Sequence, residues 1–146
     1  MEKDDTDSML AVRKGLELGY RRFELYGALD GERLDHTVAN LQALTFLRSQ
    51  GARGYLLGRE QIATVIADEQ AVFHGAKGIL SVFCMGETAT GVTIQGMQYE
   101  LENSTLSADF PLGVSNHFIG KEAEISVAKG SLLLLWDVDN PLPNLE

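Results

Sequence analysis

The sequence predicts a chain of two unlike parts: a remnant of an α/β layer over residues 1–52, followed by an all-β part, a β-sandwich, over residues 53–146. Apolar residues recur at helical spacing only in the first part. From about Arg53 onward, short runs rich in β-forming residues alternate with turns that contain Gly or Asn. Short strands at regular spacing are typical of sandwiches and barrels.

A helix and a strand are predicted at the start of the first part. Residues Met9–Glu17 place apolar and charged groups at helical spacing, with Thr6 or Asp5 as the capping residue and Gly19 as the end. Arg22–Tyr26 is a short aromatic and aliphatic run that predicts a strand.

A second helix follows a loop rich in Gly and Asp. It is predicted over Thr37–Leu47 and stops near Gly51. Helix, strand, loop and helix in this order are typical of a parallel sheet with crossovers. A single strand leaves the edges of such a layer unpaired. We therefore expect either that another chain supplies strands or that an N-terminal portion is absent.

The second part is predicted to hold short strands and no long helix. The predicted strands are Tyr55–Leu57, Ile62–Ile66, Ala71–His74, Ile79–Met85, Gly91–Ile94, Met97–Leu101, Glu124–Val127 and Ser131–Trp136.

Charge and cysteine content narrow the class of protein. The chain has 12 basic and 21 acidic residues, a net charge of −9. That balance repels nucleic acid and anionic lipid, and any phosphate site then needs metal ions or focused positive charge. The single cysteine, Cys84, excludes an intrachain disulfide and favours a reducing compartment. With an acidic start and no long apolar run, the sequence predicts a soluble cytoplasmic protein without nucleic-acid or membrane partners.

The first candidate site is Lys3-Asp4-Asp5-Thr6-Asp7, at the start of the first helix. Carboxylates there can hold Mg²⁺, while free backbone N–H groups and Lys3 suit phosphate oxygens. The alternative is simple capping, because acidic residues are favoured near helix N-termini.

Two further candidates lie in loops. In Gly31–His36, Arg33 can bind phosphate as a planar fork, and Asp35 can bind metal or accept a proton; the alternative is a capped helix with a solvated Arg. In Gly113–His117, Ser115 and Asn116 can hydrogen-bond the edge of a heterocycle, although a turn explains them equally well.

In this order, the segments resemble the prokaryotic thiamine pyrophosphokinase family. The likeness runs from residue 2 to about residue 136. The matching elements are Glu2-Lys3-Asp4-Asp5-Thr6-Asp7, Gly31 with Arg33-Leu34-Asp35-His36-Thr37-Val38-Ala39-Asn40-Leu41, Gly91-Val92-Thr93 with Gly96, Gly113-Val114-Ser115-Asn116, and Gly130 before an apolar strand.

The resemblance implies an α/β nucleotide-binding domain followed by a β-sandwich that binds thiamine and forms a homodimer. It implies that Asp7 binds Mg²⁺ and pyrophosphate, that Asp35 is a second catalytic and metal-binding carboxylate, and that Arg33 clamps phosphate. Lys3 and Thr6 would lie near ATP.

On the vitamin side, the resemblance implies that Ser115 and Asn116 contact thiamine across the dimer interface. The hydroxyethyl oxygen of thiamine would attack the β-phosphorus of ATP and release AMP. Because such a transfer relies on positioning and charge stabilisation, Mg²⁺ and Arg33 would be central to it.

The sequence departs from the family at two places. The loop from Gly27 to Arg33 is one residue longer than usual, with Asp30 and Glu32 where glycines are common. The family's Gly-Asp-x-Asp-Ser element, which supplies two further metal carboxylates, does not occur in the sequence. We therefore expect no turnover from this chain alone. The alternatives are a non-catalytic thiamine-binding and dimerisation module and an interaction domain without a small ligand.

Overall fold

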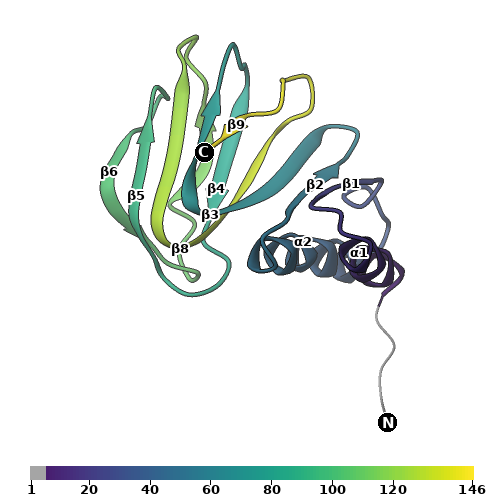
Figure 1. Ribbon diagram of the computed structural model, residues 1–146. Helices are drawn as coiled ribbons and strands as arrows, with labels where there is room; N and C mark the ends of the chain where they lie inside the picture. Colours follow the sequence, from purple (N-terminus) through teal and green to yellow (C-terminus); the bar gives the residue numbers. More distant parts are fainter. Residues whose placement is uncertain (1–5) are drawn as a thin grey trace.

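The computed structural model describes residues 6–146, which form two helices and one mixed sheet of nine strands (Figure 1). The helices are α1 (Asp7–Glu17) and α2 (Leu34–Ser49). The strands are β1 (Arg22–Tyr26), β2 (Arg53–Leu57), β3 (Gln61–Phe73), β4 (Ile79–Phe83), β5 (Ala89–Gln95), β6 (Leu101–Leu106), β7 (Gly113–His117), β8 (Ala123–Asp137) and β9 (Asn144–Leu145).

The long β3–β8 pair organises the sheet. One branch has the order β1-β2-β3-β8-β4-β7, with β1 and β2 parallel and the other pairs antiparallel. Strands β5 and β6 extend from the other half of β8, and β9 pairs with the far end of β3. The sheet therefore runs without interruption from the helical part into the β-rich part, so the structure is mixed α/β. The predicted α/β layer is seen in the two helices and the parallel β1–β2 pair, but this layer and the β-rich part share one sheet.

The β3–β8 pair bends at a bulge. Its register shifts between Ala67 and Glu69, and the intervening Asp68 has φ +49°, in the left-handed region that non-glycine residues rarely adopt. On β8, Gly130 has φ +86° beside the same bulge. The bend lets the two ends of each long strand belong to different branches of the sheet.

A buried ion cluster holds this bend to the helical part. The Glu69 carboxylate accepts hydrogen bonds from Arg48 Nε at 2.9 Å, Arg53 Nη2 at 2.5 Å and the Ala67 N–H at 3.1 Å. Arg53 also donates to the Val65 carbonyl at 2.6 Å. Burial raises the pKa of Glu69, but the hydrogen bond from Arg53 and its positive charge outweigh burial, so the pKa lies below its ordinary value. The cluster joins the end of α2 and the start of β2 to the bulge.

Strand β8 explains the apolar run near the C-terminus. Leu132, Leu134 and Trp136 point into the main core. Leu133 and Leu135 point to the opposite face, where they pack in the cluster that contains Leu44 of α2. Because both faces of this half of β8 are covered, the strand is continuously hydrophobic instead of alternating.

The helices lie on one side of the β1–β2 pair (Figure 1). The Thr6 side chain caps α1 by accepting a hydrogen bond from the Met9 N–H at 3.2 Å, so of the two predicted caps Thr6 is confirmed. Val12 and Leu47 are buried between the helices and pack against Phe23. Neither helix in residues 6–146 is long and apolar enough to cross a membrane.

Several predicted elements differ in extent. Strands β3 and β8 each replace two predicted short strands, because the bulge carries the chain through residues that read as turns. Residues 97–100 form a turn before β6 instead of a strand, and Gly113–His117 forms β7 instead of a loop. The strand Arg22–Tyr26 has the predicted bounds.

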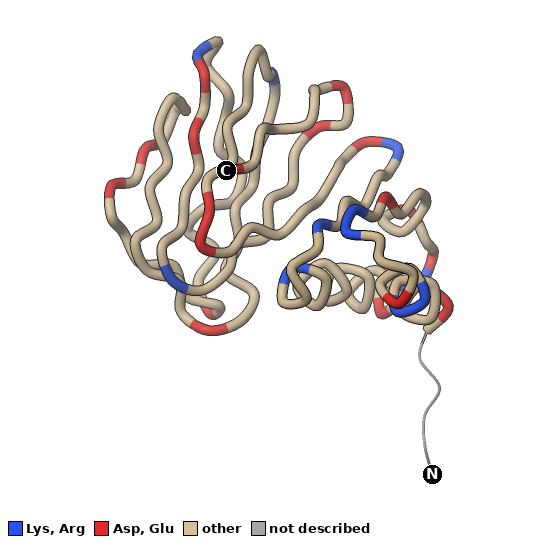
Figure 2. Tube along the Cα trace, viewed as in Figure 1, with Lys and Arg blue, Asp and Glu red and all other residues tan. Residues whose placement is uncertain are grey.

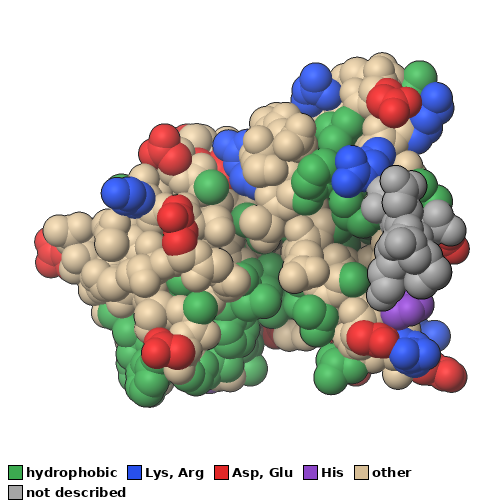
Figure 3. All heavy atoms as spheres, turned by 90° about the horizontal axis from the view of Figure 1, so that it is seen from below, with side chains coloured by type: hydrophobic (Ala, Val, Ile, Leu, Met, Phe, Trp, Pro, Cys, Tyr) green, Lys and Arg blue, Asp and Glu red, His purple; other side chains and the backbone are tan. Residues whose placement is uncertain are grey.

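Acidic and hydrophobic side chains are each concentrated on parts of the surface. Figure 2 shows acidic side chains spread along the β-rich part, and over residues 53–146 they outnumber basic ones by more than two to one. Figure 3 shows hydrophobic side chains gathered on one side of that part. The large exposed hydrophobic residues there include Met85, Tyr99, Phe110, Leu112, Val114 and Ile119.

Candidate functional site

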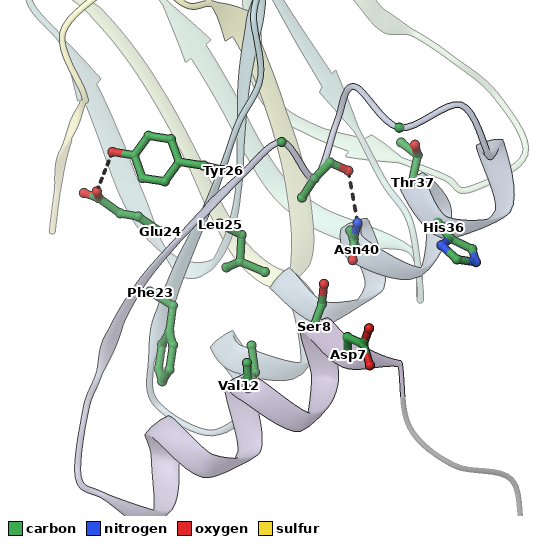
Figure 4. Close-up of a pocket in the computed structure, with 14 residues that line it drawn as sticks. Asp7, Ser8, Val12, Phe23, Glu24, Leu25, Tyr26, His36, Thr37 and Asn40 are labelled. Atoms are coloured by element: carbon green, nitrogen blue, oxygen red, sulfur yellow. Dashed lines mark hydrogen bonds between the residues drawn. The ribbon is translucent and has the colours of Figure 1, made fainter.

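A cavity of about 540 Å³ opens where α1, β1 and α2 meet (Figure 4). The first turn of α1 contributes Asp7 and Ser8, and the first turns of α2 contribute His36, Thr37 and Asn40. Strand β1 and the loop after it supply the remaining wall, made of Phe23, Glu24, Leu25, Tyr26, Gly27, Ala28 and Gly31, opposite Ala11 and Val12 of α1. Polar groups thus come from two helix starts and apolar groups from between them.

The polar side chains converge at one end of this cavity. Figure 4 shows Asp7, Ser8 and Asn40 close together, with His36 beside them, whereas Glu24 and Tyr26 extend from the other side of β1. A neighbouring hollow is lined by Thr6, Asp7, Ser8, His36 and Asn40. Backbone N–H groups at a helix start and the helix dipole make such an end suitable for an anion.

Asp7 lines the cavity as the first residue of α1, with Thr6 as its cap. The hydroxyl of Thr6 already accepts the Met9 N–H, so its structural role is that of the predicted helix cap. Lys3 and the acidic residues before Thr6 lie outside the described residues.

Arg33 and Asp35 form an exposed pair at the start of α2. Arg33 Nη2 lies 2.6 Å from Asp35 Oδ2, and the two side chains are 71% and 60% exposed. The hydrogen bond from Arg33 lowers the pKa of the Asp35 carboxyl below its ordinary value. The structure therefore brings these two predicted residues together, but neither lines the cavity that Asp7 lines; the adjacent His36 does.

The lengthened loop after β1 is fixed at two points. Asn40 Nδ2 donates to the Ala28 carbonyl at 3.0 Å. The Asp30 carboxylate accepts the Arg59 N–H of the β2–β3 turn at 2.9 Å. Asp30 thus has a structural role in placing the loop.

The described residues can offer a divalent cation only part of a coordination shell. In residues 6–146 no three His, Cys, Asp or Glu side chains gather as a metal-binding group. Asp7 brings one carboxylate to the cavity, and Asp35 is engaged by Arg33. This donor set fits Mg²⁺, which is commonly held by one or two carboxylates together with substrate phosphates and water.

A second cavity, of about 410 Å³, lies in the β-rich part. Its walls are Ile94 of β5, Tyr99 and Glu100 of the turn, Leu101 of β6, and Leu112, Gly113, Val114 and Asn116 around β7. Most of these groups are apolar, with one aromatic ring and one carboxylate among them. Such a lining suits a small organic molecule with a flat apolar body.

Asn116 shapes this second cavity. Its side chain is buried; Oδ1 accepts the N–H groups of Tyr99 and His117, both at 2.9 Å, and Nδ2 donates to the Tyr99 carbonyl at 2.7 Å. An amide nitrogen has two N–H donors. Among the described residues the second Nδ2–H has no partner, so it is available to a ligand.

Ser115 lies beside this cavity without lining it. Its side chain is exposed, its φ is +58°, and its N–H donates to Ser81 Oγ at 3.0 Å. The neighbouring Gly113 approaches β4 so closely that a Cβ there would lie 2.5 Å from the Val82 carbonyl oxygen. Side chains at Ser115 and Asn116 therefore point to different environments.

Sequence reasoning gave no role to several residues that line the cavities. His36 and Asn40 lie in the segment Arg33–Leu41, whose pattern indicates no function for them, and the run that contains Tyr99 and Glu100 predicts a strand. Contacts between residues far apart in sequence create the turn that presents Tyr99: the bonds of Asn116 and the bond from the Gln98 N–H to the His117 carbonyl. The spacing of His36 and Asn40, four residues apart on α2, was the one available signal that they share a face.

Both cavities, of about 540 and 410 Å³, have the size of small-molecule binding sites. A sequence model of the family described as thiamin pyrophosphokinase, vitamin B1 binding domain, matches residues 66–132. Thiamine pyrophosphokinase of Bacillus subtilis is 26% identical over 140 residues, which are 94% of this chain and 65% of that protein. The chain is therefore similar to thiamine pyrophosphokinases over most of its length, and residues 66–132 match their vitamin-B1-binding domain.

Solved structures of thiamine pyrophosphokinases have a fold similar to that of this chain. The crystal structure of the Bacillus subtilis thiamine pyrophosphokinase has a TM-score of 0.85 at 24% identity, over 94% of this chain and 65% of that one. That from Geobacillus thermodenitrificans has a TM-score of 0.79 at 28% identity, over 92% and 62%. That from Enterococcus faecalis has a TM-score of 0.78 at 27% identity, over 93% and 65%. The chain thus spans about 65% of the length of the Bacillus subtilis relative.

Proposed function

We propose that this protein serves thiamine pyrophosphokinase chemistry, the transfer of a pyrophosphoryl group from ATP to thiamine that gives thiamine diphosphate and AMP. The observation that carries the proposal is the match of residues 66–132 to the vitamin-B1-binding domain. That segment contains all eight residues that line the second cavity. Residues 1–52 would be part of the nucleotide-binding domain, and residues 53–146 a β-sandwich.

Thiamine would occupy the second cavity. The apolar walls suit its ring systems, and the spare Nδ2–H of Asn116 can donate to a ring nitrogen. Ser115, exposed next to Asn116, would add a hydroxyl at the rim. The exposed Tyr99, Leu112 and Val114 surround the same cavity and favour a homodimer whose partner would cover it.

The triphosphate of ATP would lie at the cavity between α1, β1 and α2. Asp7 would hold Mg²⁺ there, with Thr6 and Lys3 near the nucleotide, and the start of α1 would face the phosphate oxygens. When bound, Mg²⁺ would neutralise part of the negative charge of the phosphates.

Arg33 and Asp35 would act at the edge of this cavity. Asp35 accepts the hydrogen bond that orients Arg33, whose remaining N–H donors are suited to phosphate. A phosphate that takes over Arg33 would release Asp35 as a second carboxylate for the cation. These residues would stabilise charge on the transferred group while the thiamine hydroxyl attacks the β-phosphorus.

A second function is favoured by two observations. The described residues gather no group of three metal-binding side chains, and the Gly-Asp-x-Asp-Ser element does not occur in the sequence. Both fit a thiamine-binding and dimerisation module that does not itself catalyse the transfer.

Calorimetric titration tests both functions. We expect thiamine to bind without nucleotide, and Mg-ATP to bind at the other cavity. Asp7→Asn should weaken Mg-ATP binding and leave thiamine binding unchanged, whereas Asp109→Asn, at a residue that lines neither cavity, should change neither.

An AMP-release assay on the same samples separates the two functions. AMP formation that depends on thiamine would assign the transfer to this chain, and thiamine binding without AMP would assign the module. Absence of any thiamine binding would contradict both.

A further inference from the structure

The second cavity combines an exposed aromatic ring with a fixed negative charge. Tyr99 is 65% exposed, and its backbone is held by Asn116 on both its N–H and its carbonyl. Glu100 follows directly, and among the described residues that line this cavity it is the one that carries charge. The other walls are apolar or amide groups.

The Glu100 carboxylate is anchored to the turn that carries it. Its Oε2 accepts the Gly96 N–H at 2.8 Å. Gly96 has φ +78°, and a Cβ there would lie within van der Waals overlap of the Glu122 carbonyl oxygen, so the turn approaches its neighbour closely. The carboxylate of this cavity-lining residue is therefore tied to backbone that has little freedom to move.

This combination complements a flat aromatic cation. A positive ring is attracted by a carboxylate at the wall and by the face of an aromatic side chain. The acidic excess of the β-rich part adds a field of the same sign (Figure 2). A neutral ligand of the same shape would be stabilised only by its contacts with the apolar walls.

We propose that Glu100 is a specificity-determining residue that selects the positively charged ring of the ligand in this cavity. The inference rests on the proposed function, because thiamine carries a permanent positive charge on its thiazolium ring. Glu100 and Tyr99 would together distinguish thiamine from neutral heterocycles of similar size.

Glu100→Gln tests the proposal with little change in structure. The amide oxygen of Gln can still accept the Gly96 N–H, so the turn is kept while the charge is removed. We expect about threefold weaker binding of thiamine at low ionic strength, since exposed ion pairs contribute modestly. Binding of the neutral analogue, in which carbon replaces the charged thiazolium nitrogen, should not change.

Glu102→Gln is the matched control, because Glu102 is an exposed acidic residue two positions along that does not line the cavity. It should leave the affinity for both ligands unchanged. Equal loss for thiamine and the neutral analogue in Glu100→Gln, or no loss for either, would overturn the proposal.

The salt dependence of binding, measured on the unaltered protein, tests the proposal without relying on a variant that must fold correctly. Added salt should weaken the binding of thiamine more than that of the neutral analogue, because only the charged ring is screened. Identical salt dependence would overturn the proposal. Failure of the unaltered protein to bind thiamine at all would instead refute the proposed function.

Discussion

Replacing Asn116 by alanine should destabilise the β-rich part and loosen the wall of its cavity. The buried amide makes three hydrogen bonds, two to the Tyr99 backbone and one to the His117 N–H. Each is worth about 1 kcal/mol net, and water can reach part of the turn, so we expect a loss of about 2–3 kcal/mol. Tyr99 and the residues after it would lose their link to β7.

Urea unfolding followed by tryptophan fluorescence measures this loss, because Trp136 lies buried in the same core. Ser115→Ala is the control: its side chain is exposed, and the change should stay within about 0.5 kcal/mol. Asn116→Asp would bury a carboxylate and place one of its oxygens against the Tyr99 carbonyl, so a loss at least as large as that of Asn116→Ala is expected at neutral pH. An Asn116→Ala protein as stable as the unaltered one would refute the assigned role.

Three further predictions concern other parts of the fold. Glu69→Gln should cost about 3 kcal/mol near pH 7, because it leaves two arginines at the bulge without their buried counter-charge. Since the folded pKa of Glu69 is lowered, this stability is present above the unfolded value of 4.5 and is lost as pH falls through the folded pKa; the difference between variant and unaltered protein in urea should shrink below about pH 4. Gly113→Ala should lower stability by about 2 kcal/mol, measured by thermal unfolding, because its Cβ meets the Val82 carbonyl; an unchanged midpoint would show that β7 can move away. Thr6→Ala should cost about 1 kcal/mol through loss of the α1 cap, and amide exchange that stays slow in the first turn of α1 would contradict this.

Local patterns predicted the elements that depend on local interactions. The strand Arg22–Tyr26 and the cap at Thr6 follow from short runs of residues and from one side chain bonding three positions along. The two long strands were predicted as four short ones, because polar and glycine residues at the bulge interrupt the apolar pattern. Glu69 and its two arginines hold that bulge, and their separation in sequence conceals the contact.

The candidate sites, too, could be predicted only where they depend on residues that are close in sequence. Asp7 at a helix start and the Arg33–Asp35 pair could be singled out, since each depends on neighbours in sequence. That Asp7 shares a cavity with Asn40 depends on how α1 and α2 pack, which periodicity does not give. The turn that presents Tyr99 depends on a side chain 17 positions away, so the local pattern predicts a strand there instead.

An NMR titration of the backbone amides with thiamine tests the central claim, that the β-rich part holds the vitamin in the cavity beside β7. We expect chemical-shift changes at Tyr99, Glu100, Gly113 and Val114, with the amides around Asp7 unaffected. Changes confined to the cavity between α1, β1 and α2, or none at saturating thiamine, would contradict it.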